Sequence, residues 1–307
     1  MAKTMRAARA SVVAVVVLGP LVLAPGPARA TSPGRSGAIV FAAAKPLDAP
    51  RGLFRVDADG SGLARVLPKA TWEDMAAAWS PDGTTLAFTS DRGGSRDIWS
   101  FVPGSGEQPV QLTDTPKRQE WLPTWSPDGR LAFLSERARR TTIDVLDPAT
   151  GARTSILSAR ALYGVEWSPR GSRIAYAIDR GGAVAIGAVH PDGSGRARWS
   201  GGLAHAVVYD WRPDARWVVF QGDAGGRRAL FEIAAGGTHR IRRLTHSGPG
   251  EIDQHAVYAP GGTKVAFVRT TAKGDELWLV RADGAHERRL RACHRMRVYG
   301  VTWQPLT

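Results

Sequence analysis

Short stretches of polar and aromatic side chains recur along the chain, each lying a few residues before a Trp or Tyr. We expect these stretches to form the mouth of a binding channel, because a hydrophobic core would not use such residues. Ordinary solvated loops are the alternative. The candidate binding residues are Trp72, Glu73, Asp74, Gln119, Glu120, Trp121, Tyr163, His205, Asp253, Gln254, His255, Arg297 and Tyr299.

Two kinds of chemistry are open to these residues. The carboxylates Glu73, Asp74, Glu120 and Asp253 could form an acid/base pair for cleaving a glycan. His205, Asp253 and His255 could ligate zinc or a similar ion if the fold brought them together. Three ligands scattered over two repeats are a weak signal, so we predict no metal, no cofactor and no catalytic residue.

The elements that must position these residues belong to a repeat. Trp-Ser-Pro-Asp-Gly begins at positions 79 and 125, and weaker copies begin at 167, 211, 258 and 303, with spacings of 46, 42, 44, 47 and 45 residues. After each copy come an apolar strand, a polar turn, a third strand, a Gly-rich turn and a short outer strand. A period of this length built from short strands is typical of a β-propeller.

The two ends of the chain complete the pattern. The sixth copy has an inner strand and little else, whereas segments 38–41, 53–56 and 65–67 match the missing strands. Joining both ends in one blade would leave no open edge in the ring. The sequence therefore predicts an all-β, six-bladed β-propeller over residues 39–307, with four-stranded antiparallel blades and a ring closed by the N- and C-terminal strands in one blade.

The N-terminus has the features of a signal peptide over residues 1–30. Basic residues precede an apolar run at 12–24, and Ala28-Arg29-Ala30 resembles a cleavage site. That run is shorter than the roughly 20 residues of a membrane span. A membrane anchor or buried helix is the alternative. We predict an exported protein, secreted or in the periplasm and cell envelope, with a short linker at 31–38 and no transmembrane span after processing.

The repeat resembles that of TolB-like six-bladed β-propellers, also described as WD40-like β-propeller repeats. The resemblance rests on Trp-Ser-Pro-Asp-Gly, Leu-Ala-Phe, Ile-Trp and Gln-Leu-Thr, and is most complete over residues 79–113 and 125–135. It implies a ring with a central channel, used as a noncatalytic surface for proteins or small ligands. Some related propellers precede a serine-peptidase domain, but no Gly-x-Ser-x-Gly motif occurs in this sequence.

Charge adds a weaker signal. The formal net charge is +13, and removing residues 1–30, with four basic residues and no acidic one, leaves +9. Arginine clusters at 137–140, 240–243 and 288–297 could contact an anionic surface, whereas an exported protein without a binding motif is not expected to bind nucleic acid.

We predict a monomeric, noncatalytic scaffold that binds an envelope or extracellular protein, or a small ligand, at the channel mouth. The alternative is a carbohydrate-active hydrolase or lyase using the rim carboxylates, with or without a metal.

Overall fold

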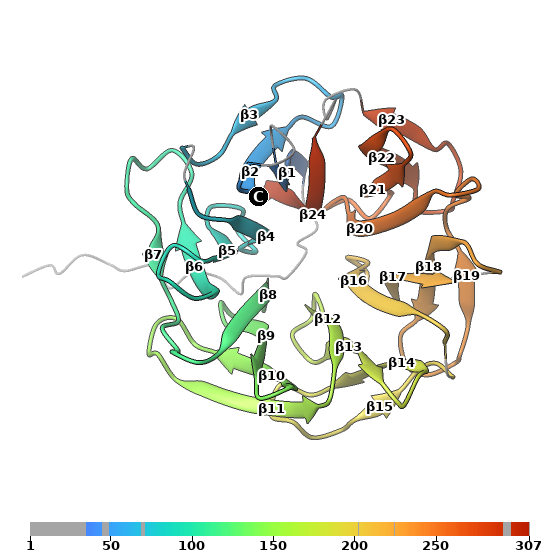
Figure 1. Ribbon diagram of the computed structural model, residues 1–307. Helices are drawn as coiled ribbons and strands as arrows, with labels where there is room; N and C mark the ends of the chain where they lie inside the picture. Colours follow the sequence, from blue (N-terminus) through green and yellow to red (C-terminus); the bar gives the residue numbers. More distant parts are fainter. Residues whose placement is uncertain are drawn as a thin grey trace, which may run out of the picture.

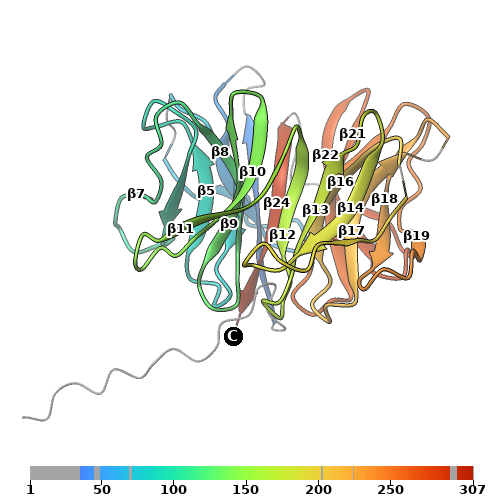
Figure 2. The same cartoon turned by 90° about the horizontal axis from the view of Figure 1, so that it is seen from below.

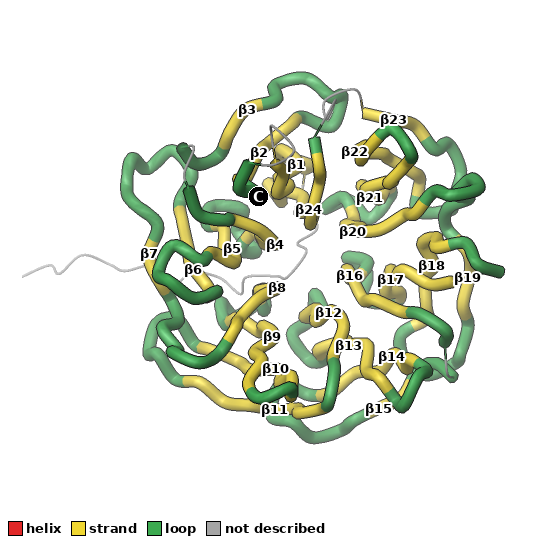
Figure 3. The backbone as a smooth tube through the Cα atoms, viewed as in Figure 1, coloured by secondary structure: helices red, strands yellow, loops and turns green. Residues whose placement is uncertain are grey.

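The computed structural model describes residues 35–44, 49–68, 71–201, 203–223, 225–290 and 296–306. Strands and turns make up this part of the chain (Figure 3), and no helix in it is long and apolar enough to cross a membrane. The predicted signal peptide and the first residues of the predicted linker lie outside the described residues. The same is true of Cys293, the one cysteine of the chain.

Four of the sheets in the described part of the chain have four antiparallel strands each. Three of them are β4 (Asp74–Trp79), β5 (Leu86–Ser90), β6 (Asp97–Phe101) and β7 (Val110–Gln111); β8 (Gln119–Trp125), β9 (Leu131–Arg137), β10 (Arg140–Leu146) and β11 (Arg153–Ala159); and β12 (Leu162–Trp167), β13 (Ile174–Asp179), β14 (Val184–Val189) and β15 (Ala197–Arg198). In each, strands that follow one another in the chain are neighbours.

An eight-stranded sheet follows along the chain. It contains β16 (Ala206–Trp211), β17 (Trp217–Asp223), β18 (Arg228–Ala234) and β19 (Ile241–Arg243), then β20 (Ile252–Tyr258), β21 (Lys264–Thr271), β22 (Gly274–Arg281) and β23 (Arg288–Leu290). Pairing within each group of four is antiparallel. The two groups meet in a single parallel pairing, Arg228 with Ile252.

The last sheet combines both ends of the described chain. β24 (Arg297–Leu306) pairs with β1 (Arg35–Ala44), which continues to β2 (Gly52–Val56) and β3 (Ala64–Arg65). β1 begins four residues before the predicted start of the propeller, because Arg35 and Ser36 pair with Leu306 and Pro305. Part of the predicted linker is therefore strand.

The sheets stand around a common centre as a propeller (Figure 1), and together they form a broad, shallow ring when seen from the side (Figure 2). β4, β8, β12, β16, β20 and β24 lie innermost. The repeated Trp or Tyr ends or nearly ends each of these strands, and two of the indoles join neighbouring sheets. The indole of Trp125 donates to the carbonyl oxygen of Ala78 at 3.2 Å, and that of Trp211 to the carbonyl oxygen of Glu166 at 3.0 Å.

A bulge interrupts every inner strand. Five of these strands hold a residue with positive φ three positions before the repeated Trp or Tyr: Ala76, Leu122, Gly164, His255 and Gly300. The register shifts at each of these points. In β16 the shift falls at Tyr209 instead, where the preceding residue is Val208, whose β-branched side chain disfavours positive φ. Because a bulge exchanges the faces of a strand, it decides which side chains reach the centre of the ring.

Candidate functional site

A cavity of about 430 Å³ lies at the centre of the ring, and all six inner strands line it. Its wall has two parts. Ala77, Leu122, Pro123 and Val301, from β4, β8 and β24, make one side largely apolar. The other side, from β12, β16 and β20, carries ionisable and amide groups. A cavity of this size with a few converging polar groups has the usual form of a ligand site.

Glu166 on β12 is an acid of the cavity wall with a raised pKa. Its half-buried carboxyl accepts a hydrogen bond from the hydroxyl of Thr124 on β8. Burial raises the pKa of Glu166 well above its usual value, and the negative charge of Asp210 raises it further. Glu166 therefore keeps its proton to higher pH than a free carboxyl, and it can present an O–H donor to a ligand.

Asp210 on β16 has a different environment. Its carboxylate accepts the backbone N–H groups of Trp211 and Tyr258, each at 2.7 Å, so it links β16 to β20. Thr124 has the same role between β8 and β12, where it accepts the N–H of Trp167 at 3.3 Å. Hydrogen bonds from N–H groups favour an ionised carboxyl. The cavity wall thus contains Glu166, which resists ionisation, and Asp210, whose carboxylate accepts two backbone N–H groups.

His205 has its ring orientation fixed by an amide. The Gln221 side-chain nitrogen donates to the carbonyl oxygen of Asp253 at 2.7 Å, so the Gln221 oxygen must face His205. The 2.7 Å contact between this oxygen and Nε2 of His205 then requires Nε2 to carry a proton. In the neutral ring, Nδ1 remains as the acceptor.

His255 and Tyr209 form an aromatic pair in the same wall, with ring centroids 5.7 Å apart. Burial lowers the pKa of His255 to about 4, so this imidazole is neutral at physiological pH. Burial also raises the pKa of Tyr209, which keeps its phenol protonated. The pair can therefore exchange hydrogen bonds with a ligand without adding charge.

Of the predicted site residues, the structure places His205, Gln254 and His255 in the cavity wall. Trp72, Gln119, Tyr163 and Arg297 are exposed, and Trp121 packs partly buried against the hydrophobic cluster between β9 and β14. Glu73 pairs with Arg51 at 2.6 Å, and the Arg51 guanidinium lies 3.9 Å from the ring centre of Tyr299. These residues do not gather in the cavity.

The remaining predicted carboxylates point into their own sheets. Asp74 pairs with Arg92 at 2.6 Å, and Glu120 pairs with Arg153 at 2.7 Å. Asp253 meets Arg269 through two bonds of 2.6 and 2.8 Å. All three acids are almost completely buried. Burial is the first cause of a raised pKa at Asp74, and the bond from Arg92 opposes it.

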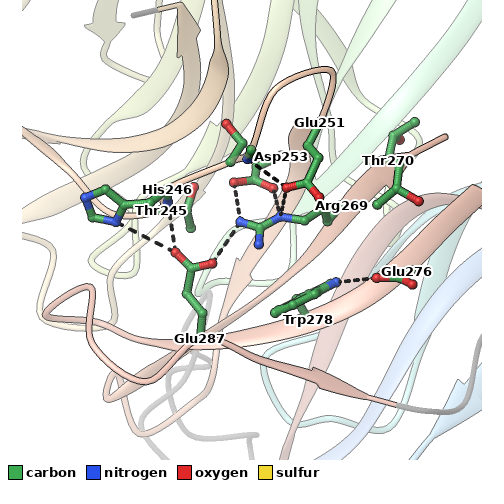
Figure 4. Close-up of polar contacts among 12 residues, drawn as sticks. Thr245, His246, Glu251, Asp253, Arg269, Thr270, Glu276, Trp278 and Glu287 are labelled. Carbon is green, nitrogen blue, oxygen red and sulfur yellow. Dashed lines mark hydrogen bonds and ion pairs between the residues drawn. The ribbon is translucent and has the colours of Figure 1, made fainter. Parts of the chain in front are cut away.

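The Arg269 cluster is the most extensive of these pairings (Figure 4). Besides Asp253, the guanidinium meets Glu287 at 2.8 Å and Glu251 at 3.7 Å. It lies 4.6 Å from the ring centre of Trp278. The bonds from Asp253 and the surrounding negative charge raise the pKa of Arg269 although burial alone would lower it. A carboxylate held in this way is satisfied within the fold.

The position in the repeat explains this burial. Asp74, Glu120 and Asp253 each stand five residues before the repeated Trp or Tyr, where the other copies have apolar residues. Those are Leu162, Ala206 and Val298, and all are buried. This position precedes the bulge and faces the sheet interior, whereas the cavity is lined by the residues from about four positions before the Trp or Tyr up to it. The acids are core substitutions paired with arginine.

The metal hypothesis loses one of its three ligands by the same argument, because Arg269 occupies both oxygens of Asp253. Among the described residues, no three His, Cys, Asp or Glu side chains converge as they would around a metal ion.

Sequence reasoning missed Glu166 and Asp210, although a signal was present. Both stand directly before the repeated Trp, where the other copies have Ala78, Thr124, Val257 and Thr302. Acids occur at this place in two consecutive copies only. Aligning the repeats column by column would have singled them out.

The chain matches the family model described as TolB beta propeller domain over residues 104–294. It is 24% identical over 238 residues to the Tol-Pal system protein TolB of Francisella tularensis, which covers 74% of this chain and 53% of that protein. An uncharacterised protein of Agrobacterium fabrum is 26% identical over 196 residues, covering 63% of this chain and 64% of the relative. The chain thus spans about half to two thirds of the length of these relatives.

A solved structure of similar fold is TolB from Acinetobacter baumannii, with a TM-score of 0.75 and 18% identity, covering 88% of this chain and 67% of that one. The fold and the match over residues 104–294 agree: the chain belongs to the TolB beta propeller domain family.

Proposed function

We propose that this protein is an exported, noncatalytic β-propeller that binds a protein segment or a small ligand in its central cavity. The cavity carries this proposal: its volume is about 430 Å³, it lies at the centre of the ring, and all six inner strands contribute to its wall. Glu166, His205 and Tyr209 supply polar groups, while β4, β8 and β24 supply an apolar surface. Such a wall suits a ligand with one polar and one apolar side.

The proposal includes a specific architecture. Counting β16–β19 and β20–β23 as separate blades, since a single pairing joins them, gives six blades, and the pairing of β24 with β1 then closes the ring. Residues 1–30 are the signal peptide and the propeller occupies 39–307, with strand β1 reaching back to Arg35. N-terminal sequencing of the secreted or periplasmic product should begin at Thr31.

A noncatalytic function is favoured by the fate of the predicted carboxylates. Asp74, Glu120 and Asp253 are bound by arginines of their own sheets, so they are not free to transfer protons to a substrate. A hydrolase or lyase would have to use Glu166 and Asp210 instead, with the protonated Glu166 as the acid and Asp210 as the base. Release of reducing ends from polygalacturonate or cell-wall glycans, abolished in Glu166→Gln, would support that alternative.

The partner is proposed to be an envelope or extracellular protein, or a small molecule from that compartment. This follows from the predicted export and from similarity to relatives named as Tol-Pal system proteins. The propeller is proposed to act as a monomer, with its cavity open to the partner.

Affinity capture from an envelope fraction tests the proposal. The baits are the wild-type protein, a Glu166→Gln/Tyr209→Ala variant and a Trp72→Ala control, which changes an exposed aromatic outside the cavity. We expect a partner that the control retains and the cavity variant enriches at least about tenfold less. Native mass spectrometry of the purified baits tests for a small ligand. We expect the wild type and the control to carry it and the cavity variant to lose it. Equal capture by all three baits, with no small molecule lost, would contradict cavity binding.

A further inference from the structure

The outer part of the β12–β15 sheet carries a group of arginines without acidic partners. They are Arg170, Arg173, Arg180, Arg196 and Arg198. Within the described part of the chain, none of the five lies within ion-pair distance of a carboxylate. This differs from Arg92, Arg153 and Arg269, which neutralise buried acids.

These arginines line two hollows that share Arg198. The larger, of about 430 Å³, holds Arg170, Arg173 and Arg198 and is bordered by Trp211 and the turn at 235–237. The smaller, of about 240 Å³, holds Arg180, Arg196 and Arg198 and is bordered by Leu157 and Ser158. Among the residues that the structure describes, no Asp or Glu lines either hollow.

The hollows lie on opposite faces of the β12–β15 sheet. The larger one is shared with residues of β16 and of the turn after β18, and the smaller one with residues of β11. Figure 1 shows the β12–β15 sheet between these two neighbours, with β15 on the outside of the ring. Arg198 on β15 therefore stands between two positively charged recesses.

Backbone contacts hold three of the guanidinium groups. Arg173 donates to the carbonyl oxygen of Gly195 at 2.7 Å, Arg198 to that of Ser200 at 2.8 Å, and Arg196 to that of Ile156 at 3.5 Å. Each contact uses one of the five N–H donors of a guanidinium. The remaining donors can bind a carboxylate in the two-bonded geometry that arginine favours.

The strand between the hollows ends its sheet. In the described part of the chain, β15 pairs with β14 alone, through Arg198 with Gly187 and Ala197 with Ala188. An extended segment added at such an edge would hydrogen-bond to the backbone, and its successive side chains would point to opposite faces of the sheet. Two adjacent acidic residues would then enter the two hollows, one on each side.

We propose that the β15 edge is a second binding site, which takes an extended acidic peptide segment with adjacent Asp or Glu residues. A flat membrane surface could not reach into the two hollows, whereas the side chains of a peptide can, so the hollows favour a peptide as the ligand. The alternation of side chains favours a peptide over an anionic glycan, and this site is independent of the central cavity.

Fluorescence anisotropy with a labelled peptide of repeated Glu-Glu pairs separated by Val tests the proposal, using the purified mature protein. We expect saturable binding that Arg170→Gln/Arg180→Gln weakens about tenfold, since one guanidinium is removed from each hollow. Arg137→Gln/Arg139→Gln is the matched control: both residues are exposed on the β9–β10 hairpin and line neither hollow. We expect this variant to change the affinity less than about twofold.

Three further probes decide between occupants. The same peptide with N-methylated Val residues should bind more weakly, because it cannot pair with the strand edge. Equal losses of affinity in the two double variants, or undiminished binding of the N-methylated peptide, would overturn edge docking. Tighter binding of heparin or of phosphatidylglycerol vesicles than of the peptide, weakened by Arg170→Gln/Arg180→Gln, would overturn the peptide as the occupant.

Discussion

Acidic side chains of the inner strands occupy two different environments. In the Arg269 cluster, Asp253 is enclosed in its own sheet and bound by a guanidinium through both oxygens. In the central cavity, Glu166 faces a second carboxylate, Asp210, and its pKa rises. The first arrangement neutralises charge for the sake of the fold, whereas the second places two carboxyl groups together at a free volume, which the fold alone does not require.

A bulge separates the two environments along each strand. Asp253 stands before His255 in β20, and Glu166 stands after Gly164 in β12, where the two positive-φ residues mark the change of face. The same strands therefore supply a structural face and a cavity face within five residues.

The largest effect should come from the structural region. Asp253→Ala leaves the buried Arg269 without its two-bonded partner, and removing one member of a buried pair costs about 3–5 kcal/mol of the free energy of unfolding. Urea denaturation measures this loss. Asp283→Ala removes an exposed partner of Arg281 and should barely move the urea midpoint. Similar midpoints for both variants would show that the Arg269 cluster does not stabilise the fold.

Gly164→Ala tests how closely the strands meet at the cavity. A Cβ at residue 164, with φ of +80°, would lie 2.1 Å from the backbone oxygen of Val208, whereas one at Gly181, with φ of +79°, would meet nothing within 4 Å. We expect a loss of about 3 kcal/mol for Gly164→Ala, from strain and overpacking, against about 1 kcal/mol for Gly181→Ala. Equal losses would mean that β12 and β16 can separate freely.

His255 links stability to acid. Its pKa is about 4 in the folded protein against an ordinary 6.5, so the unfolded chain binds more protons between these values. Stability is therefore lost as the pH falls from 6.5 to 4, by up to about 3 kcal/mol. His255→Asn, which tolerates the φ of 51°, should remove this acid-dependent loss in urea titrations at several pH values. If His255→Asn lost as much stability as the wild type between pH 6.5 and 4, the imidazole would be exposed to water and not buried.

Glu166→Gln should have the smallest effect, with the opposite sign. Because the folded pKa of Glu166 is raised, the unfolded chain releases its proton first, and wild-type stability falls as the pH rises above about 4.5. The variant should lack this fall and gain about 1 kcal/mol at neutral pH. Asp210→Asn should instead destabilise, since it weakens acceptors for two backbone N–H groups. Destabilisation by both variants would remove the distinction between the two acids.

The repeat was sufficient to predict an all-β propeller, since the Trp-Ser-Pro-Asp-Gly copies carry both the turn chemistry and the period. It also predicted strand segments at both ends that share one sheet, β1 and β24. These features depend on local sequence, which recurs often enough to be recognised.

The direction of each inner side chain could not be predicted in the same way. Positive φ at the bulge falls on Ala76, Leu122 and His255 in three strands, and glycine marks it only at Gly164 and Gly300. Tertiary packing imposes this conformation on residues that do not prefer it. Unless the position of the bulge is known, the alternation of side chains along the strand does not predict whether Asp253 or Gln254 reaches the cavity.

Site-specific photocrosslinking tests the central claim most directly. A benzoylphenylalanine placed at Tyr209 lies in the cavity wall, whereas the same group at Tyr163, which is 39% exposed, lies outside it. After irradiation in an envelope extract, cavity binding predicts a discrete adduct from position 209 and none from position 163. An adduct from position 163 with none from position 209 would contradict it.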